Sequence, residues 1–175
     1  GLPAKSPTYG NWESTGLDGH MGGHYVSALA LMVASTGDAQ AKQKLDYAIA
    51  ELKRCQDALG TGYIGGIPHG AKAWGQLGAG QLKVDSFSLN GRWVPWYNIH
   101  KVFAGLRDAW VYTGNADAHP MLVKLPHWAL RLTTPLTDAQ MQDMLRAEHG
   151  GMNEVLADVA QMTGDLRYLA LARRF

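Results

Sequence analysis

The chain has 175 residues, of which 46% are hydrophobic and 18% are charged, and these proportions are ordinary for one globular domain. Its formal net charge of +1 provides no basic surface, so we do not expect nucleic acid as a partner. No apolar run reaches the roughly 20 residues that a membrane-spanning helix needs, so we expect no membrane partner either. The single cysteine, Cys55, excludes an internal disulfide framework.

The first helical run, residues 24–38, reads HYVSALALMVASTGD and ends at Thr-Gly-Asp. Gly37 suits the left-handed position that closes a helix, and Asp38 can accept hydrogen bonds from the free N–H groups that open the next helix. Residues 39–59 continue as an amphipathic helix, because their apolar side chains recur at helical spacing. The two runs therefore predict a helical hairpin with a very short loop.

A Gly-rich insertion, residues 60–96, follows this hairpin and contains nine glycines. Long loops in compact domains are uncommon and usually functional. An Asn-Gly dipeptide at 90–91, between SFSL and RWV, predicts a β-hairpin with a type I′ turn. The insertion delivers Trp93, Trp96 and Tyr97 to the start of the next helix. These aromatic rings could form the floor of a sugar pocket or fill a gap between helix layers, and composition favours neither.

Two further helical hairpins are predicted later in the chain, over 101–133 and 153–175. In each, the first helix again ends at Thr-Gly followed by Asn or Asp, and it is richer in Ala, Leu and Val than the second. This asymmetry predicts two concentric layers, with the first helices inside and the second helices facing solvent.

The Thr-Gly pairs lie at 36–37, 113–114 and 163–164, and this uneven spacing argues against a regular α-solenoid. We therefore predict an all-α fold, a partial (α/α)6-type toroid of helical hairpins whose Gly-rich insertion carries a small β-hairpin. The chain lacks an initiator Met and a signal-peptide segment, and it ends within a predicted helix. We accordingly expect residues 1–175 to form a single partial domain, the N-terminal segment of the barrel in a longer protein.

Histidine, amide and acidic residues open each of the three inner helices. If the helix N-termini face one funnel, these groups gather in one place, where the helix dipoles favour oxygen-rich ligands. The residues concerned are His24, His100 and Lys101, and then Glu148, His149, Asn153 and Glu154.

His20 and His24 are four residues apart, a spacing that can bind zinc on a helix. However, no Glu lies between them as in the His-Glu-x-x-His motif, and Gly22 and Gly23 disfavour a helix at this point. A pocket-rim role or a structural role at a helix end is favoured. Glu148 and Glu154 could act as a catalytic pair. The two residues are six positions apart with a Gly-Gly pair between them, and this spacing does not define the distance between their carboxylates. A role in helix capping or substrate binding is therefore favoured for both.

The segments GHYVSALALMVASTGD, WVPWYNIHKVFAGLRDAWVYTGN and GGMNEVLADVAQMTGDLRYLALARRF closely resemble the bacterial β-L-arabinofuranosidases, a glycoside hydrolase family of the 127/146 type that was formerly a domain of unknown function. The resemblance runs from about Tyr9 to Phe175. It implies an (α/α) toroid followed by β-sandwich domains, and the retaining hydrolysis of L-arabinofuranosides in plant-type glycans. It therefore implies a carbohydrate partner, and a secreted or periplasmic location follows from that substrate.

The resemblance also implies a cysteine nucleophile in a zinc–thiolate cluster and a glutamate acid/base, carried by a Glu-x-Cys motif and a Cys-Cys pair. A zinc-bound thiolate is chemically sound because the metal keeps the sulfur deprotonated. This chain contains neither motif. We therefore expect it to hold no catalytic residue and no metal or cofactor of its own, with zinc bound by the full-length parent, and to be inactive alone.

What remains is an expected set of substrate-binding residues. The resemblance supplies the histidines, the acids and the amide, and the two aromatics come from the insertion. The set is His20, His24, Trp96, Tyr97, His100, Glu148, Asn153 and Glu154.

Two alternatives stay open at this stage. A non-catalytic helical-repeat binding module would show the same polar helix ends. An epimerase-like (α/α)6 toroid acting on free sugars would share the fold and a His-rich funnel. Fold alone does not choose between these functions, whereas the sequence motifs favour the glycosidase.

Overall fold

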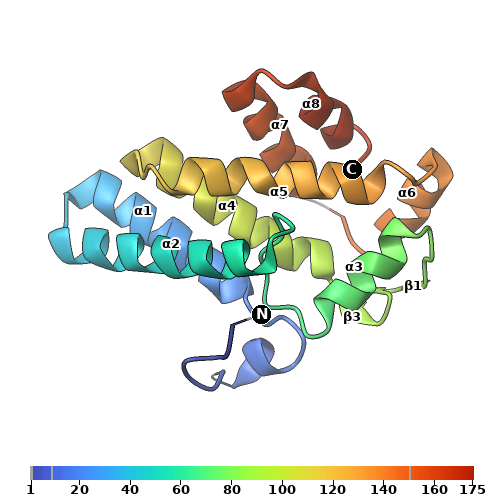
Figure 1. Cartoon of the computed structure of the whole chain (residues 1–175), viewed down its shortest axis with the longest axis horizontal. Coiled ribbons are helices and arrows are strands. Elements are labelled where there is room, and N and C mark those ends of the chain that lie inside the picture. The colour runs from blue at the N-terminus through green and yellow to red at the C-terminus, as the bar shows by residue number, and fades with distance from the viewer. Residues whose placement is uncertain (1, 9, 150) are drawn as a thin grey trace.

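The structure, a computed structural model, describes residues 2–8, 10–149 and 151–175 (Figure 1). Tyr9, where the sequence resemblance begins, and Gly150 of the EHGGMNE segment lie outside the described residues. The described part contains one short 3-10 helix, eight α-helices and three short strands: η1 (Asn11–Ser14), α1 (His20–Thr36), α2 (Ala39–Leu59), α3 (Gly70–Gly78), β1 (Val84–Asp85), β2 (Ser88–Leu89), β3 (Arg92–Trp93), α4 (Pro95–Thr113), α5 (Ala118–Thr133), α6 (Asp138–Leu145), α7 (Met152–Thr163) and α8 (Leu166–Ala172).

The long helices form two layers, as the repeat predicts. In the inner layer α4 packs against α1 on one side and α7 on the other. In the outer layer α5 contacts both α2 and α8, and each outer helix also packs against the inner helix that precedes it (Figure 1). This mostly-α arrangement is consistent with a segment of a helical toroid. No helix in the described ranges has the length and hydropathy needed to cross a membrane.

The Thr-Gly junctions fold as expected. The three closing glycines have positive φ angles, of 68° at Gly37, 66° at Gly114 and 72° at Gly164. Asp38 then accepts a hydrogen bond from the Ala41 N–H at 2.7 Å, which caps α2. The corresponding Asp165 accepts one from the Arg167 N–H at 3.0 Å and caps α8. The predicted pairing of helices through Gly and an N-cap residue is therefore confirmed at Gly37 and Gly164. In the middle pair the N-cap residue of α5 is Asp117, and Asn115 accepts hydrogen bonds from the N–H groups of Asp117 and Ala118.

The predicted β-hairpin is also present in the insertion. Strands β2 and β3 pair antiparallel, with Ser88 opposite Trp93, and Asn90 and Gly91 both have positive φ as a type I′ turn requires. Within the insertion the structure adds two elements that the sequence did not lead us to expect, and outside it the unexpected elements are η1 and α6. Strand β1 extends the hairpin to three strands, and helix α3 packs against α5.

Candidate functional site

The N-terminal ends of α1, α4 and α7 bring together six polar side chains, which we call the rim cluster: His20, His24, Tyr97, His100, Lys101 and Glu154. The rings of His20 and His24 lie 5.9 Å apart, which shows that the two histidines share one face of α1. The Tyr97 ring lies 6.0 Å from that of His20, and the Lys101 ammonium lies 4.6 Å from the centre of the Tyr97 ring. Gly22 and Gly23 are both inside α1, so the expected break in the helix at these glycines is absent.

His20 is held in a fixed orientation by two hydrogen-bond acceptors that lie close to its Nδ1 atom. Its side chain is buried, and Nδ1 lies 2.6 Å from a Glu13 carboxylate oxygen and 2.7 Å from the Leu17 carbonyl oxygen. Because both neighbours accept hydrogen bonds, Nδ1 carries a proton. In the neutral ring Nε2 is then an acceptor. Sequence reasoning missed Glu13, which lies in η1 with no repeat or motif to mark it.

The remaining rim histidines are kept neutral by their surroundings. Burial lowers the pKa of His100 to about 4, helped by the positive charge of Lys101 and by His24. Burial, Lys101 and His20 together lower the pKa of His24 in the same direction. Burial also lowers the pKa of Lys101, while the Glu154 carboxylate opposes that effect. At neutral pH His24 and His100 therefore offer uncharged imidazoles, which can donate to and accept from hydroxyl groups.

Glu148 serves as a capping group for α4 in this structure. Its two carboxylate oxygens accept hydrogen bonds from the N–H groups of Trp96 at 2.6 Å and Tyr97 at 2.9 Å. The N-cap residue of α4 is Val94, whose side chain has no acceptor, so a carboxylate from a distant part of the chain supplies it. Burial raises the pKa of Glu148 to about 7, although both N–H groups act in the opposite direction.

Glu13 caps α1 in the same way. Its carboxylate accepts hydrogen bonds from the N–H groups of Gly19 at 2.7 Å and Met21 at 2.9 Å. Gly19 is the N-cap residue of α1 and has no side chain to do this. Helices α1 and α4 therefore each depend on a buried carboxylate from outside the helix to satisfy their first N–H groups.

An aromatic cavity of about 370 Å³ adjoins the rim cluster at Tyr97. Its other aromatic lining residues are Trp12, Phe87 and Trp93, all of which are exposed. Trp12 also lies 6.5 Å from the His20 ring, which connects the cavity to the cluster from the opposite side. Exposed aromatic rings beside hydrogen-bonding side chains are suited to a ligand with an apolar face and a polar edge.

The three aromatic residues Trp93, Trp96 and Tyr97, at or just before the start of α4, divide between the two roles that the sequence left open. Trp93 and Tyr97 line the aromatic cavity. Trp96 is only 2% exposed and packs against Trp74 and Phe175, with ring centres 4.8 and 4.9 Å away. Trp96 thus belongs to the core between the layers, and its position does not support the expected role in substrate binding.

Asn153 lies outside the rim contacts described above. It is exposed at the start of α7, where its side-chain oxygen accepts a hydrogen bond from the neighbouring Glu154 N–H at 2.9 Å.

The zinc that the sequence resemblance implies finds no ligand set in this part of the protein. No group of three or more His, Cys, Asp or Glu side chains among the described residues is arranged to hold a metal ion. Cys55, the only thiol of the chain, lies in the outer helix α2. The residues present do not fit a zinc–thiolate centre, and the rim cluster is a set of hydrogen-bonding groups.

Comparison with known sequences identifies the family of the chain. No curated protein sequence matches the chain. The sequence model of the β-L-arabinofuranosidase, GH127 catalytic domain matches residues 1–175, the whole chain. The family resemblance seen in the helical motifs is therefore confirmed, and the chain belongs to the GH127 β-L-arabinofuranosidase catalytic-domain family.

Proposed function

We propose that this chain forms the substrate-binding rim of an enzyme that hydrolyses L-arabinofuranosides in plant-type glycans. Membership of a glycoside hydrolase family makes carbohydrate the substrate class. The observation that carries the finer proposal is the convergence of His20, His24 and His100 beside the aromatic cavity. Because such glycans occur outside the cell that degrades them, we also propose a secreted or periplasmic location.

The chemistry of the rim suits a furanose ring and its neighbours. Trp12 and Trp93 present aromatic faces against which the C–H face of a sugar can pack. The uncharged imidazoles of His24 and His100 and the Lys101 ammonium then supply hydrogen bonds to sugar hydroxyls. In this proposal these residues bind and orient the substrate, and they perform no bond-breaking step.

In this proposal the catalytic groups are not among these 175 residues. Both oxygens of Glu148 are engaged with the backbone of α4, so its role is to position Tyr97 at the cavity. The Glu-x-Cys and Cys-Cys motifs of the family, which would supply the acid/base and the nucleophile, do not occur in these 175 residues. We propose that the full-length protein supplies them, and that this segment alone is inactive.

The test is the release of p-nitrophenol from p-nitrophenyl β-L-arabinofuranoside by the full-length protein. A His24→Ala variant should raise KM roughly three- to tenfold, because it removes one or two hydrogen bonds to the substrate. A His119→Ala variant is the matched control, since His119 stacks on Trp110 in the outer part of the molecule. It should leave KM unchanged.

Other outcomes would select the alternatives. Binding of arabino-oligosaccharides by the full-length protein without release of the aglycone would indicate a binding module. Interconversion of free sugars without hydrolysis would indicate an epimerase-like toroid. Loss of hydrolysis on zinc chelation would support the assignment of the metal to the full-length protein, whereas chelator-resistant hydrolysis would contradict it.

A further inference from the structure

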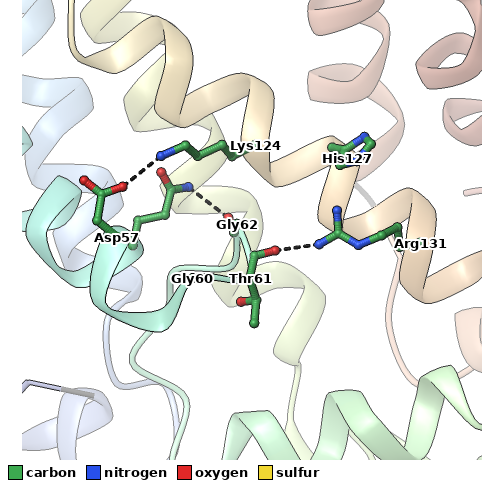
Figure 2. Close-up of a pocket in the computed structure, with 8 residues that line it drawn as sticks. Asp57, Gly60, Thr61, Gly62, Lys124, His127 and Arg131 are labelled. Atoms are coloured by element: carbon green, nitrogen blue, oxygen red, sulfur yellow. Dashed lines mark hydrogen bonds and ion pairs between the residues drawn. The ribbon is translucent and has the colours of Figure 1, made fainter.

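Two adjoining cavities lie in the outer layer, where the end of α2 and the following loop meet α5. The smaller one, of about 280 Å³, is lined mainly by polar residue types, and Figure 2 shows it. The larger one, of about 710 Å³, is mostly apolar and has Tyr63, Trp74 and Trp128 in its wall. Thr61 and Arg131 line both cavities and so connect them. We call the two together the outer groove; no member of the rim cluster lines it in the described structure.

Arg131 is the charged group at the junction of the two cavities. Its Nη2 donates a hydrogen bond to the Thr61 carbonyl oxygen at 2.6 Å, as Figure 2 shows. No carboxylate of the described residues pairs with it. By contrast, Lys124 in the same groove forms an ion pair with Asp57 at 2.8 Å (Figure 2). The guanidinium therefore keeps donors free for an acceptor that enters the groove.

The wall of the larger cavity contains further donors and no acid. Among the described residues that line it there is no Asp or Glu. The Tyr63 hydroxyl and the Trp74 indole N–H are buried, and the indole N–H is the group of the described chain that interacts with the hydroxyl. Burial raises the pKa of Tyr63 to about 12, so its hydroxyl remains protonated. Helix α3 also opens at this cavity, and its N-cap residue His69 makes no side-chain cap in the described structure.

We propose that the outer groove is an accessory binding site for an oligosaccharide that carries a uronic acid. The ligand carboxylate pairs with Arg131, which is the one cation of the groove without a described acidic partner. The sugar rings occupy the larger cavity against its mostly apolar wall, and ring hydroxyls reach the smaller cavity beside Gln56 and Asp57. Each cavity is near or within the size range of small-molecule sites.

This inference goes beyond the proposed function and does not depend on it, because it concerns binding without turnover. Cys55 provides a direct reporter. It lines the larger cavity, is partly accessible, and is the only cysteine among these residues. Its alkylation by iodoacetamide in the full-length protein can be followed by peptide mass spectrometry, in the presence of trigalacturonate as the probe.

Trigalacturonate should slow the alkylation of Cys55, and the trimethyl ester of the same trisaccharide should not. An Arg131→Gln variant should weaken this protection roughly tenfold or more, because a charge-assisted hydrogen bond is lost. Arg131→Lys should retain part of the protection. Arg146→Gln removes a solvent-exposed arginine of the α6 end, which pairs with Asp143, and should behave as the parent protein does.

Three results would overturn the proposal. Equal protection by the acid and its methyl ester would show that the carboxylate is not recognised. Absence of protection by trigalacturonate would show that the acid does not bind at this groove. Failure of Cys55 to react without any ligand would show that another part of the protein fills the cavity. A His24→Ala variant, which alters only the rim, should keep the protection and so separates this site from the proposed hydrolysis.

Discussion

Gly23 of α1 lies directly against the main chain of Lys101 in α4. A side chain at Gly23 would overlap the Lys101 carbonyl group, and one at Gly105, a turn further along α4, would come within 2.7 Å of the Gly23 carbonyl oxygen. The two inner helices therefore meet backbone to backbone at this point. This contact places Lys101 close to His24, whose pKa is lowered by burial and then by the positive charge of Lys101.

The first prediction concerns this helix contact. Gly23→Ala should lower the free energy of unfolding by about 1–3 kcal/mol, because the new methyl group forces the helices apart. Gly22→Ala is the matched control in the same helix turn. A side chain at Gly22 meets none of the described atoms within 4 Å, so alanine should stabilise the protein by up to about 1 kcal/mol through its helix propensity. Urea unfolding of both variants measures the difference, and equal stabilities would contradict the contact.

A second prediction separates the roles of two tryptophans. Trp96→Ala should destabilise the protein by about 3–5 kcal/mol, because the indole is buried among other aromatic rings. Trp93→Ala should leave stability nearly unchanged and weaken the binding of an arabinoside by about 0.5–1.5 kcal/mol. Thermal unfolding and ligand titration give the two numbers. A stable Trp96→Ala variant with impaired binding would restore the sugar-binding role expected from the sequence.

The third prediction is a pH dependence of stability that arises at Glu148. Burial raises the pKa of this carboxyl from its ordinary value of 4.5 to about 7 in the folded protein. Between these values the folded chain holds the proton more tightly than the unfolded chain does. The stabilising contribution of Glu148 is therefore full below pH 4.5 and is lost as the pH rises through about 7.

Glu148→Gln should remove this dependence, since glutamine does not ionise. The free energy of unfolding of the variant should accordingly fall less steeply than that of the parent between pH 4.5 and about 7. Urea unfolding at several pH values measures both slopes. Parallel curves for the two proteins would show that Glu148 does not titrate in this range.

The fourth prediction tests the electrostatic coupling in the rim. Lys101→Met removes a positive charge that lowers the pKa of both His24 and His100, so both values should rise. The rise should be partial, because burial is the largest cause for each histidine. Histidine ring signals followed by NMR during a pH titration provide the measurement. Lys44→Met, on the exposed side of α2, serves as the control and should move neither value.

Local sequence signals were sufficient to predict the turns and helix junctions whose conformation depends on neighbouring residues. The Thr-Gly-Asp junction at Gly37 and the Asn-Gly turn at 90–91 each require a positive φ that glycine or asparagine adopts readily, so the hairpins could be predicted. Helix α6 begins with a capping box between Thr137 and Gln140, and this local sequence signal marks its start. Helix α3 contains three glycines, which lower its helix propensity, and packing on α5 supports it.

The sequence by itself determined the helical pairs, the two layers and the family, because periodicity, helix caps and motifs are properties of contiguous residues. It also placed histidines at the starts of the inner helices. Only the tertiary structure decided which of these groups meet. Glu13 and Glu148 cap helices through hydrogen bonds to backbone groups outside their own helices, and Trp96 turns into the core while Trp93 stays exposed. Such outcomes depend on contacts between segments far apart in the chain. A local sequence pattern does not specify which distant residue a side chain will contact.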